Sequence, residues 1–247
     1  MSLPVFIGSD SCGQDCSNVH HQGTVEFNVL STINLLEAMR ILSLKTKWYQ
    51  ASSSEMYGQV KSLPITEEHT IHPVSPYGIS KAAAHWVSVN YREAYGLYSC
   101  CGILFNHESV LRGRQFVTKK IISAVARIKK GSREVLVLGD LEIERDWGYA
   151  PDYVKAMWSM LQQDQASDYV IATGESHSLK EFVAVSFGCV DLEWQQHVSV
   201  DPKFFRPSDI RRIYGDSTKA RKHLKWSYNL SFEDLVKNLV EEEIRIQ

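Results

Sequence analysis

Apolar residues recur along the chain with two different periods, and stretches of the two periods alternate. Between residues 24 and 41 they fall at steps of three or four, which predicts an amphipathic helix with one apolar stripe. Further helices are predicted over residues 76–95, 116–130, 152–163, 178–190 and 232–244. Short apolar runs predict strands over residues 47–51, 98–105, 134–138 and 169–173. This alternation predicts an α/β protein with a parallel sheet and helices on both faces.

The ends of several predicted helices carry recognisable signals. Pro76 lacks the N–H that a helix N-terminus leaves unpaired in any case, and Gly96 is suited to end the same helix. Ser178 with Glu181 three residues later predicts a capping box, and Ser231 stands in the corresponding position before the last helix. Residues 106–115 are polar and are predicted to form a loop.

The beginning of the chain does not show the pattern of a complete nucleotide-binding domain. A doubly wound domain begins with a strand, a glycine-rich turn that holds the pyrophosphate, and a helix. The chain has no G-x-G-x-x-G sequence, and Gly8 and Gly13 have the wrong spacing. Residues 1–22 are therefore predicted to be an irregular leader, and residues 23–247 an incomplete doubly wound (Rossmann-type) parallel sheet. Without its central strand, such a sheet is expected to expose an apolar edge.

Composition narrows the classes of partner. Hydrophobic residues make up 44% and charged residues 23% of the 247 residues, as in a globular protein with a real core. The formal charge of −2 argues against nucleic acid or an anionic membrane as the main partner. No apolar run approaches the roughly 20 residues of a bilayer span. Cys100 and Cys101 are adjacent in a predicted buried strand, which favours reduced thiols and a cytoplasmic location.

Four potential zinc ligands lie in the predicted leader: Cys12, Cys16, His20 and His21. Structural zinc sites usually have more closely spaced cysteine pairs, so ordinary thiols are the preferred interpretation and no metal is expected.

Candidate chemistry is concentrated between residues 50 and 81. Ser53 and Glu55 follow a predicted strand, where open α/β sheets bind their ligands. Tyr77 and Lys81 are four residues apart and share one face of a predicted helix. An adjacent ammonium favours the phenolate, so this pair can accept a proton from an alcohol while a nicotinamide accepts hydride. By itself Y-x-x-x-K also fits a packed tyrosine beside a solvated lysine.

Several motifs occur in a characteristic order: Y-Q-A-S-S-S-E-M-Y-G, S-P-Y-G-I-S-K, V-N-Y-R-E-A-Y-G, G-I-L-F-N-H-E-S, R-D-W-G-Y-A-P-D-Y-V and F-F-R-P-S-D. Together they resemble the GDP-mannose 4,6-dehydratases, which belong to the extended short-chain dehydrogenases/reductases. The resemblance covers residue 25 to the C-terminus and begins after the units that carry the family's glycine-rich turn. It implies an NAD(P)-binding domain into which a small C-terminal substrate-binding α/β region is intercalated, over about 106–130 and 175–247.

The resemblance also implies a mechanism. Tyr77, helped by Lys81, would deprotonate the mannose 4-hydroxyl while NADP⁺ takes hydride from C4. Glu55 matches the base that removes the C5 proton, and Ser53 stands where the family usually has Thr. Water leaves from C6 and the hydride returns there, which gives GDP-4-keto-6-deoxymannose, an intermediate of GDP-fucose biosynthesis.

Binding residues are implied in the same way. Asn106, Lys120, Arg145 and Arg206 match positions that hold the GDP-sugar, and three cations with an amide suit a diphosphate and sugar hydroxyls. Asp209 stands where the family has the longer Glu. Without the resemblance, Arg145 beside Asp146 would be interpreted as a surface ion pair and Arg206 as a solvated loop residue.

The cofactor side departs from the family pattern. His107 and Arg112, together with Tyr77 and Lys81, match cofactor-contacting positions. The loop V-L-R-G-R at 110–114 replaces the family's Pro, first Arg and Glu. In the family this loop helps to form the tetramer and reaches a neighbour's cofactor, so the resemblance implies a homo-oligomer, either a dimer or a tetramer.

Two alternatives stay open beside an NADP-dependent dehydratase acting on GDP-mannose. The chain could be a non-catalytic relative that binds a nucleotide sugar or assembles with a complete subunit, which the missing glycine-rich turn favours. It could also be a sugar-nucleotide epimerase or reductase that uses the same Tyr and Lys, but Glu55 after the serine run favours the dehydratase.

Overall fold

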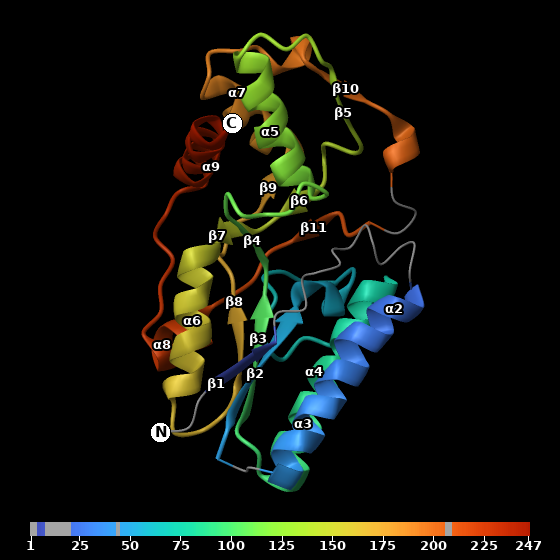
Figure 1. Cartoon of the computed structure of the whole chain (residues 1–247), viewed down its shortest axis with the longest axis vertical. Coiled ribbons are helices and arrows are strands. Elements are labelled where there is room, and N and C mark those ends of the chain that lie inside the picture. The colour runs from blue at the N-terminus through green and yellow to red at the C-terminus, as the bar shows by residue number, and fades with distance from the viewer. Residues whose placement is uncertain (1–3, 8–20, 43–44, 206–208) are drawn as a thin grey trace.

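The main sheet has four parallel strands (Figure 1). The computed structural model describes residues 4–7, 21–42, 45–205 and 209–247 of the chain. Within them the strand order is β1-β2-β3-β8, formed by Pro4–Ile7, Lys47–Ser53, Ser99–Leu104 and Asp168–Ile171. The predicted parallel α/β architecture is confirmed, and its strands 47–51, 98–105 and 169–173 agree with β2, β3 and β8 to within two residues at each end.

The expectation of an irregular leader is wrong for Pro4–Ile7. This segment is a strand that pairs in parallel with β2, from Pro4 opposite Lys47 to Ile7 opposite Gln50. Its sequence P-V-F-I favours extended backbone, and pairing satisfies the ladder groups along that side of β2. The edge of β2 that was expected to be exposed is therefore covered by β1.

Helices cover both faces of this sheet, as predicted (Figure 1). Strand β2 turns alternate side chains to opposite faces. Trp48 packs with Leu36 of α3 (Ser31–Leu42), beside α4 (Pro76–Tyr95). Tyr49 packs with residues of α6 (Ala150–Gln162) and α8 (Thr218–Leu224) on the other face. Helix α8 was not predicted from the sequence.

The helix predicted over residues 24–41 is longer and less regular than expected. It begins with α2 (His21–Val25), continues through a π-helical turn at Glu26–Leu30, and runs into α3. The Thr32 hydroxyl donates to the Asn28 carbonyl at 2.8 Å within this segment. Spacing of apolar residues identifies such a helix but does not reveal one wider turn inside it.

The predicted helix ends are confirmed in α4. The Ser75 hydroxyl accepts from the Gly78 N–H at 3.0 Å, Pro76 follows in the first turn, and Gly96 ends the helix in the left-handed conformation with φ of 66°. The capping box of Ser178 and Glu181 is also formed, at the start of α7 (Leu179–Gly188).

A second layer lies beyond the carboxyl ends of the main strands, in the upper part of Figure 1. Helices α5 (Val117–Lys129), α7 and α9 (Phe232–Ile246) pack around one apolar core. Three small sheets accompany them. They pair β5 (Leu136–Leu138) with β10 (Val198–Val200), β6 (Glu144–Arg145) with β11 (Arg212–Ile213) and β9 (His177–Ser178), and β4 (Asn106–Glu108) with β7 (Trp147–Tyr149).

The predicted loop over residues 106–115 is wrong at its start, because Asn106–Glu108 pairs in parallel with β7. The polar side chains of this short strand predict a loop, and its partner strand begins only at Trp147.

Cys100 and Cys101 are fully buried free thiols, as predicted, and burial raises the pKa of Cys100 to about 12. Over the described ranges, no helix is both long and apolar enough to cross a bilayer.

Candidate active site

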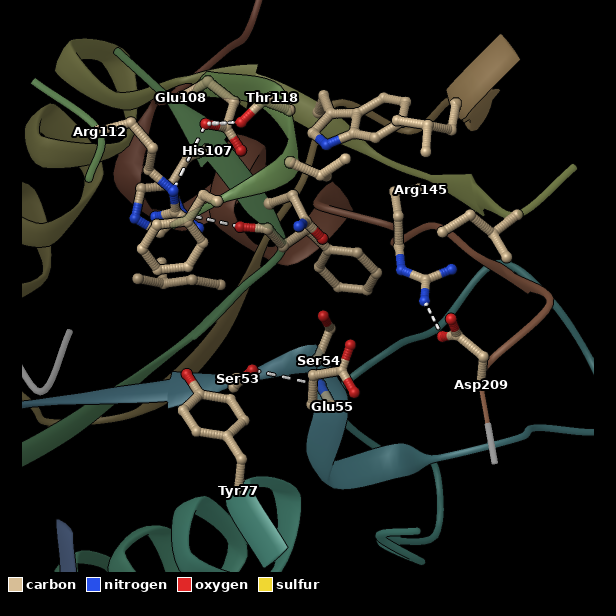
Figure 2. Close-up of a pocket in the computed structure, with 18 of the residues that line it drawn as sticks. Ser53, Ser54, Glu55, Tyr77, His107, Glu108, Arg112, Thr118, Arg145 and Asp209 are labelled. Carbon is tan, nitrogen blue, oxygen red and sulfur yellow. Dashed lines mark hydrogen bonds and ion pairs between the residues drawn. The ribbon is translucent and has the colours of Figure 1, made fainter. Parts of the chain in front are cut away.

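A pocket of about 230 Å³ opens where the main sheet meets the second layer (Figure 2). Its floor consists of the end of β2 and the first turns of α4. Its walls come from β4, the loop 109–116, β6, and the residues Phe204, Phe205 and Asp209. The carboxyl ends of parallel strands are where open α/β sheets bind ligands, and the pocket lies at this position.

The end of β2 turns sharply and thereby presents two of the predicted site residues. Residues Ser54–Tyr57 form a single 3₁₀ turn, and the Ser53 hydroxyl caps it by accepting from the Glu55 N–H at 3.3 Å. Ser53 and Glu55 both line the pocket, and the Tyr77 ring rises toward this strand end from α4 (Figure 2).

Helix α4 supplies the other two members of the predicted catalytic set. Tyr77 and Lys81 lie one turn apart on the face that meets β2, and the Lys81 ammonium lies 5.5 Å from the centre of the Tyr77 ring. Lys81 is only 2% exposed and donates to the Ala51 carbonyl at 3.0 Å. The structure therefore brings Ser53, Glu55, Tyr77 and Lys81 together at one pocket.

The predicted cofactor residues on β4 and the following loop line the same pocket. His107 Nδ1 donates to the Phe105 carbonyl at 2.8 Å, and its ring stacks on Tyr153 with the ring centres 5.1 Å apart. The Arg112 guanidinium lies 3.6 Å from the centre of the Phe116 ring, and its Nε lies 3.5 Å from Glu108 Oε2. Arg112 is thus held over the pocket of its own chain (Figure 2).

The predicted substrate side is centred on a buried guanidinium. Arg145 pairs with Asp209 Oδ1 at 2.7 Å and also donates to the carbonyls of Glu144 and Ile210 at 3.0 and 2.6 Å (Figure 2). Asp209 is one methylene shorter than Glu and still reaches this guanidinium. Asn106 lines the pocket as well.

The interpretation of Arg145 and Asp146 as a surface ion pair is wrong. Arg145 is 6% exposed and Asp146 is fully buried. The Asp146 carboxylate accepts from the backbone N–H groups of Thr173 and Gly174 at 2.9 and 3.0 Å. Burial nevertheless raises its pKa to about 6, so the cost of removing the charge from water outweighs those hydrogen bonds.

Lys120 does not line the pocket. It is exposed, donates to the Val137 carbonyl at 2.6 Å and lies 5.4 Å from the ring of Phe204, which does line the pocket. Arg206 lies outside the described residues.

The possible zinc ligands are not placed by the structure. Cys12, Cys16 and His20 lie outside the described residues, and His21 is seen only as the first residue of α2. In the part of the chain that is described, no three His, Cys, Asp or Glu side chains are grouped as a metal site would require.

Sequence reasoning missed several pocket residues. Glu108 is 2% exposed and accepts from the Thr118 hydroxyl at 2.8 Å while facing Arg112. A lone glutamate in a presumed loop gave no signal of this. Phe204 and Phe205 are about half exposed at the pocket rim, and their adjacency before R-P-S-D could have identified them.

The charge of the pocket suits a ligand with both phosphates and hydroxyls. Among its described lining residues, cationic Lys81, Arg112 and Arg145 are interspersed with the carboxylates of Glu55, Glu108, Asp140 and Asp209. Guanidinium groups hold phosphate oxygens in fixed directions, and carboxylates accept from hydroxyls.

The tyrosine and lysine suit the nicotinamide end of a dinucleotide, since one phenol and one buried ammonium face the cavity there. The residues described at this pocket do not include a glycine-rich turn.

Solved structures define the class of fold. A structure of RMD from Pseudomonas aeruginosa complexed with NADPH superposes with a TM-score of 0.89 at 23% identity, over 100% of this chain and 82% of that chain. DesIV, a dTDP-glucose 4,6-dehydratase from Streptomyces venezuelae, superposes with a TM-score of 0.86 at 22% identity, over 100% and 73%. The fold is therefore the Rossmann-type α/β fold of nucleotide-sugar dehydratases and their relatives.

Sequence comparisons define the family. The family model described as GDP-mannose 4,6 dehydratase matches residues 17–239. GDP-mannose 4,6 dehydratase 1 of Arabidopsis thaliana is 50% identical over 227 residues, which cover 90% of this chain and 63% of the relative. The human GDP-mannose 4,6 dehydratase is 43% identical over 242 residues, covering 90% and 65%. The chain belongs to the GDP-mannose 4,6-dehydratase family and spans a little under two thirds of the length of these two relatives.

Proposed function

We propose that this chain acts as an NADP-dependent GDP-mannose 4,6-dehydratase, a lyase that converts GDP-mannose to GDP-4-keto-6-deoxymannose. The observation that carries the proposal is the convergence of Ser53, Glu55, Tyr77 and Lys81 on one pocket in a member of this family. A phenol beside a buried ammonium and a separate carboxylate are the two bases that the two proton removals need.

In this mechanism Tyr77 removes the proton of the mannose 4-hydroxyl. The ammonium of Lys81 favours the phenolate that does so. Bound NADP⁺ would supply the acceptor for the C4 hydride and the source of the hydride that reduces C6. Oxidation at C4 would acidify the adjacent C5 proton. Glu55 removes this proton and delivers it to the departing 6-hydroxyl, which leaves as water. The proton that C5 regains when C6 is reduced balances the one that Tyr77 removed from the 4-hydroxyl. Ser53 holds its hydroxyl next to Glu55 and offers a hydrogen bond to the sugar oxygen.

The binding roles follow from position and charge. We assign Arg145, Asn106 and Asp209 to the GDP-sugar, because a fixed guanidinium suits a phosphate and the smaller polar groups suit hydroxyls. Lys120 and Arg206 are assigned to the same ligand on family resemblance, with Lys120 approaching from the rim beside Phe204. His107 and Arg112, with Tyr77 and Lys81, are assigned to the cofactor.

We further propose that residues 106–130 and 175–247 form the substrate-binding part. The separate apolar core around α5, α7 and α9 supports this division. A homo-oligomer is proposed as well. Apolar side chains that are 43–57% exposed on two neighbouring helical segments support it, namely Phe27, Leu30, Ile79 and Trp86.

Turnover with GDP-mannose and NADP⁺ tests the function. We expect the 4-keto product to form without net accumulation of NADPH, because the hydride is returned. The Tyr77→Phe variant should lose product formation by roughly 10²- to 10⁴-fold, the range for removal of a general base. Tyr95→Phe, at an exposed tyrosine at the end of the same helix, is the matched control and should behave as wild type.

The same assay separates the alternatives. Calorimetric binding of GDP-mannose without turnover would favour a non-catalytic binder, and turnover only after addition of a complete family subunit would favour an assembly partner. A product that keeps its 6-hydroxyl would favour an epimerase or reductase. Full activity in Tyr77→Phe would contradict the assignment of Tyr77.

A further inference from the structure

Polar residues line the buried contact between α4 and β2, where apolar packing would be ordinary. Toward its C-terminal part, α4 places the Ser88 hydroxyl 3.4 Å from the Gln50 side-chain oxygen. One turn nearer the pocket, His85 Nδ1 lies 2.9 Å from the Ser52 hydroxyl. A further turn along, Lys81 donates to the Ala51 carbonyl.

These three contacts follow one another along α4 toward the active site. Gln50 and Ser52 point to the same face of β2, because side chains two apart on a strand share a face. Ser88, His85 and Lys81 are spaced by three and four on α4 and share one helix face. The next turn of the helix toward its N-terminus carries Tyr77. Strand β2 ends at Ser53, and Glu55 lies in the 3₁₀ turn that follows.

The contact between Ser52 and His85 is buried and borders the pocket. Ser52 is 2% exposed and lines the pocket, and His85 is 5% exposed. Burial lowers the pKa of His85, with a smaller opposing effect from Asp168, so the neutral ring is favoured. A neutral imidazole and a hydroxyl form a stable hydrogen bond in either tautomer.

We propose that the Ser52–His85 hydrogen bond is a positioning contact. It fixes the position of α4 along β2, and thereby the position of Tyr77 relative to Ser53 and Glu55. The proposal rests on the proposed function only for its kinetic consequence.

Apolar contacts hold a helix on a sheet through shape alone, because burial is not directional. A buried hydrogen bond between two side chains has a narrow range of length and angle, and breaking it leaves two unpaired polar groups. Of the three contacts, Ser52–His85 is the one that joins side chains of both elements at the edge of the pocket.

Four variants test this assignment. Ser52→Ala and His85→Leu remove the contact, whereas His85→Asn keeps a polar atom at the position of Nδ1. Ser88→Ala removes the weaker contact further from the site and serves as the matched control. We expect Ser52→Ala and His85→Leu to lower kcat by ~10- to 100-fold, with little change in KM for GDP-mannose, since misplacement of reacting groups has effects of this size. His85→Asn should recover most of the loss, and Ser88→Ala should keep kcat.

A measurement that needs no turnover separates this proposal from the proposed function. Fluorotyrosine is incorporated, and the Tyr77 ¹⁹F resonance is assigned by its loss in Tyr77→Phe. The resonance should shift in Ser52→Ala and His85→Leu, return in His85→Asn, and stay in place in Ser88→Ala. If the wild type lacks turnover, the proposed function fails and the ¹⁹F result alone decides the positioning role. An unmoved Tyr77 resonance in both disrupting variants overturns it, as does failure of His85→Asn to restore the resonance.

Discussion

The ion pair between Arg92 and Asp168 joins the end of α4 to the start of β8, and Asp168→Asn tests its contribution to stability. Arg92 Nη1 and Nη2 donate to the two carboxylate oxygens at 2.7 and 2.9 Å, and the Cys101 N–H donates to Asp168 Oδ1 at 3.2 Å. Both side chains are less than one fifth exposed. The variant leaves the Arg92 charge largely buried without its counter-charge.

The expected loss follows from this geometry. Removing one partner of a fully buried pair costs about 3–5 kcal/mol, and residual exposure reduces this to about 2–3 kcal/mol here. For a chain of this size, about 2–4 °C of melting temperature is lost per kcal/mol, so the melting temperature should fall by roughly 4–12 °C. Glu241→Gln is the control, because its 3.8 Å pair with Arg245 is exposed and should contribute under about 0.5 kcal/mol.

The loss of stability in Asp168→Asn should depend on pH. Burial by itself would raise the pKa of Asp168, but the hydrogen bonds and charge of Arg92 outweigh it and lower that pKa. A carboxyl whose pKa is lower in the folded state stabilises the fold above the unfolded value and loses this effect as pH falls through the folded value. Urea unfolding of wild type and variant should therefore differ most near neutral pH and converge below about pH 4. A difference in unfolding free energy below about 0.5 kcal/mol at neutral pH, or one that stays unchanged in acid, would contradict a stabilising role of this ion pair.

Three further predictions concern the site and the sheet. Glu55→Gln should lower the rate of dehydration by roughly 10²-fold or more, because an amide cannot take the C5 proton. Product formation checks this prediction. Deuterium exchange at C5 that persists in the variant would contradict it. Gly102→Ala should lower the free energy of unfolding by about 1–3 kcal/mol, because the added Cβ would overlap the Tyr49 side chain, above all its hydroxyl. In a urea titration, adding Tyr49→Phe should recover part of this loss. No recovery would contradict the overlap. Because burial raises the folded pKa of Asp146 to about 6, the bound proton stabilises the fold, and stability should fall as pH rises from about 4 to about 6. This slope should be absent in Asp146→Asn, and an equal slope in both proteins would contradict it.

Much of the fold could be predicted from local signals in the sequence. Helix α4 was predictable from Pro76 to Gly96, because its caps and apolar spacing are properties of adjacent residues. The four residues that converge on the pocket floor were predictable for the same reason: each follows a strand or opens a helix. Strand β4 was not predictable, since its polar residues become a strand only when β7 lies beside them.

Contacts between distant residues account for the rest. The pairing of Arg145 with Asp209 joins residues 64 positions apart, and adjacency suggested Asp146 instead. Similarly, the apolar run Pro4–Ile7 was too short to identify as a strand until β2 supplied a partner. In both cases the sequence provides the chemical groups, whereas the tertiary fold determines which of them meet.

The pocket lies at the boundary between the main-sheet region and the α5–α7–α9 region, which pack around different apolar clusters. Its lining includes Leu104 and Phe105, which belong to apolar clusters packed on the main sheet, and Trp147 and Leu179, which belong to the cluster around α5, α7 and α9. A ligand that touches both sets of residues binds only when the main-sheet region and the α5–α7–α9 region are folded and correctly apposed, so its binding energy adds to the cooperativity of unfolding. Occupancy of the pocket would then make two regions that could unfold in turn behave as one thermodynamic unit.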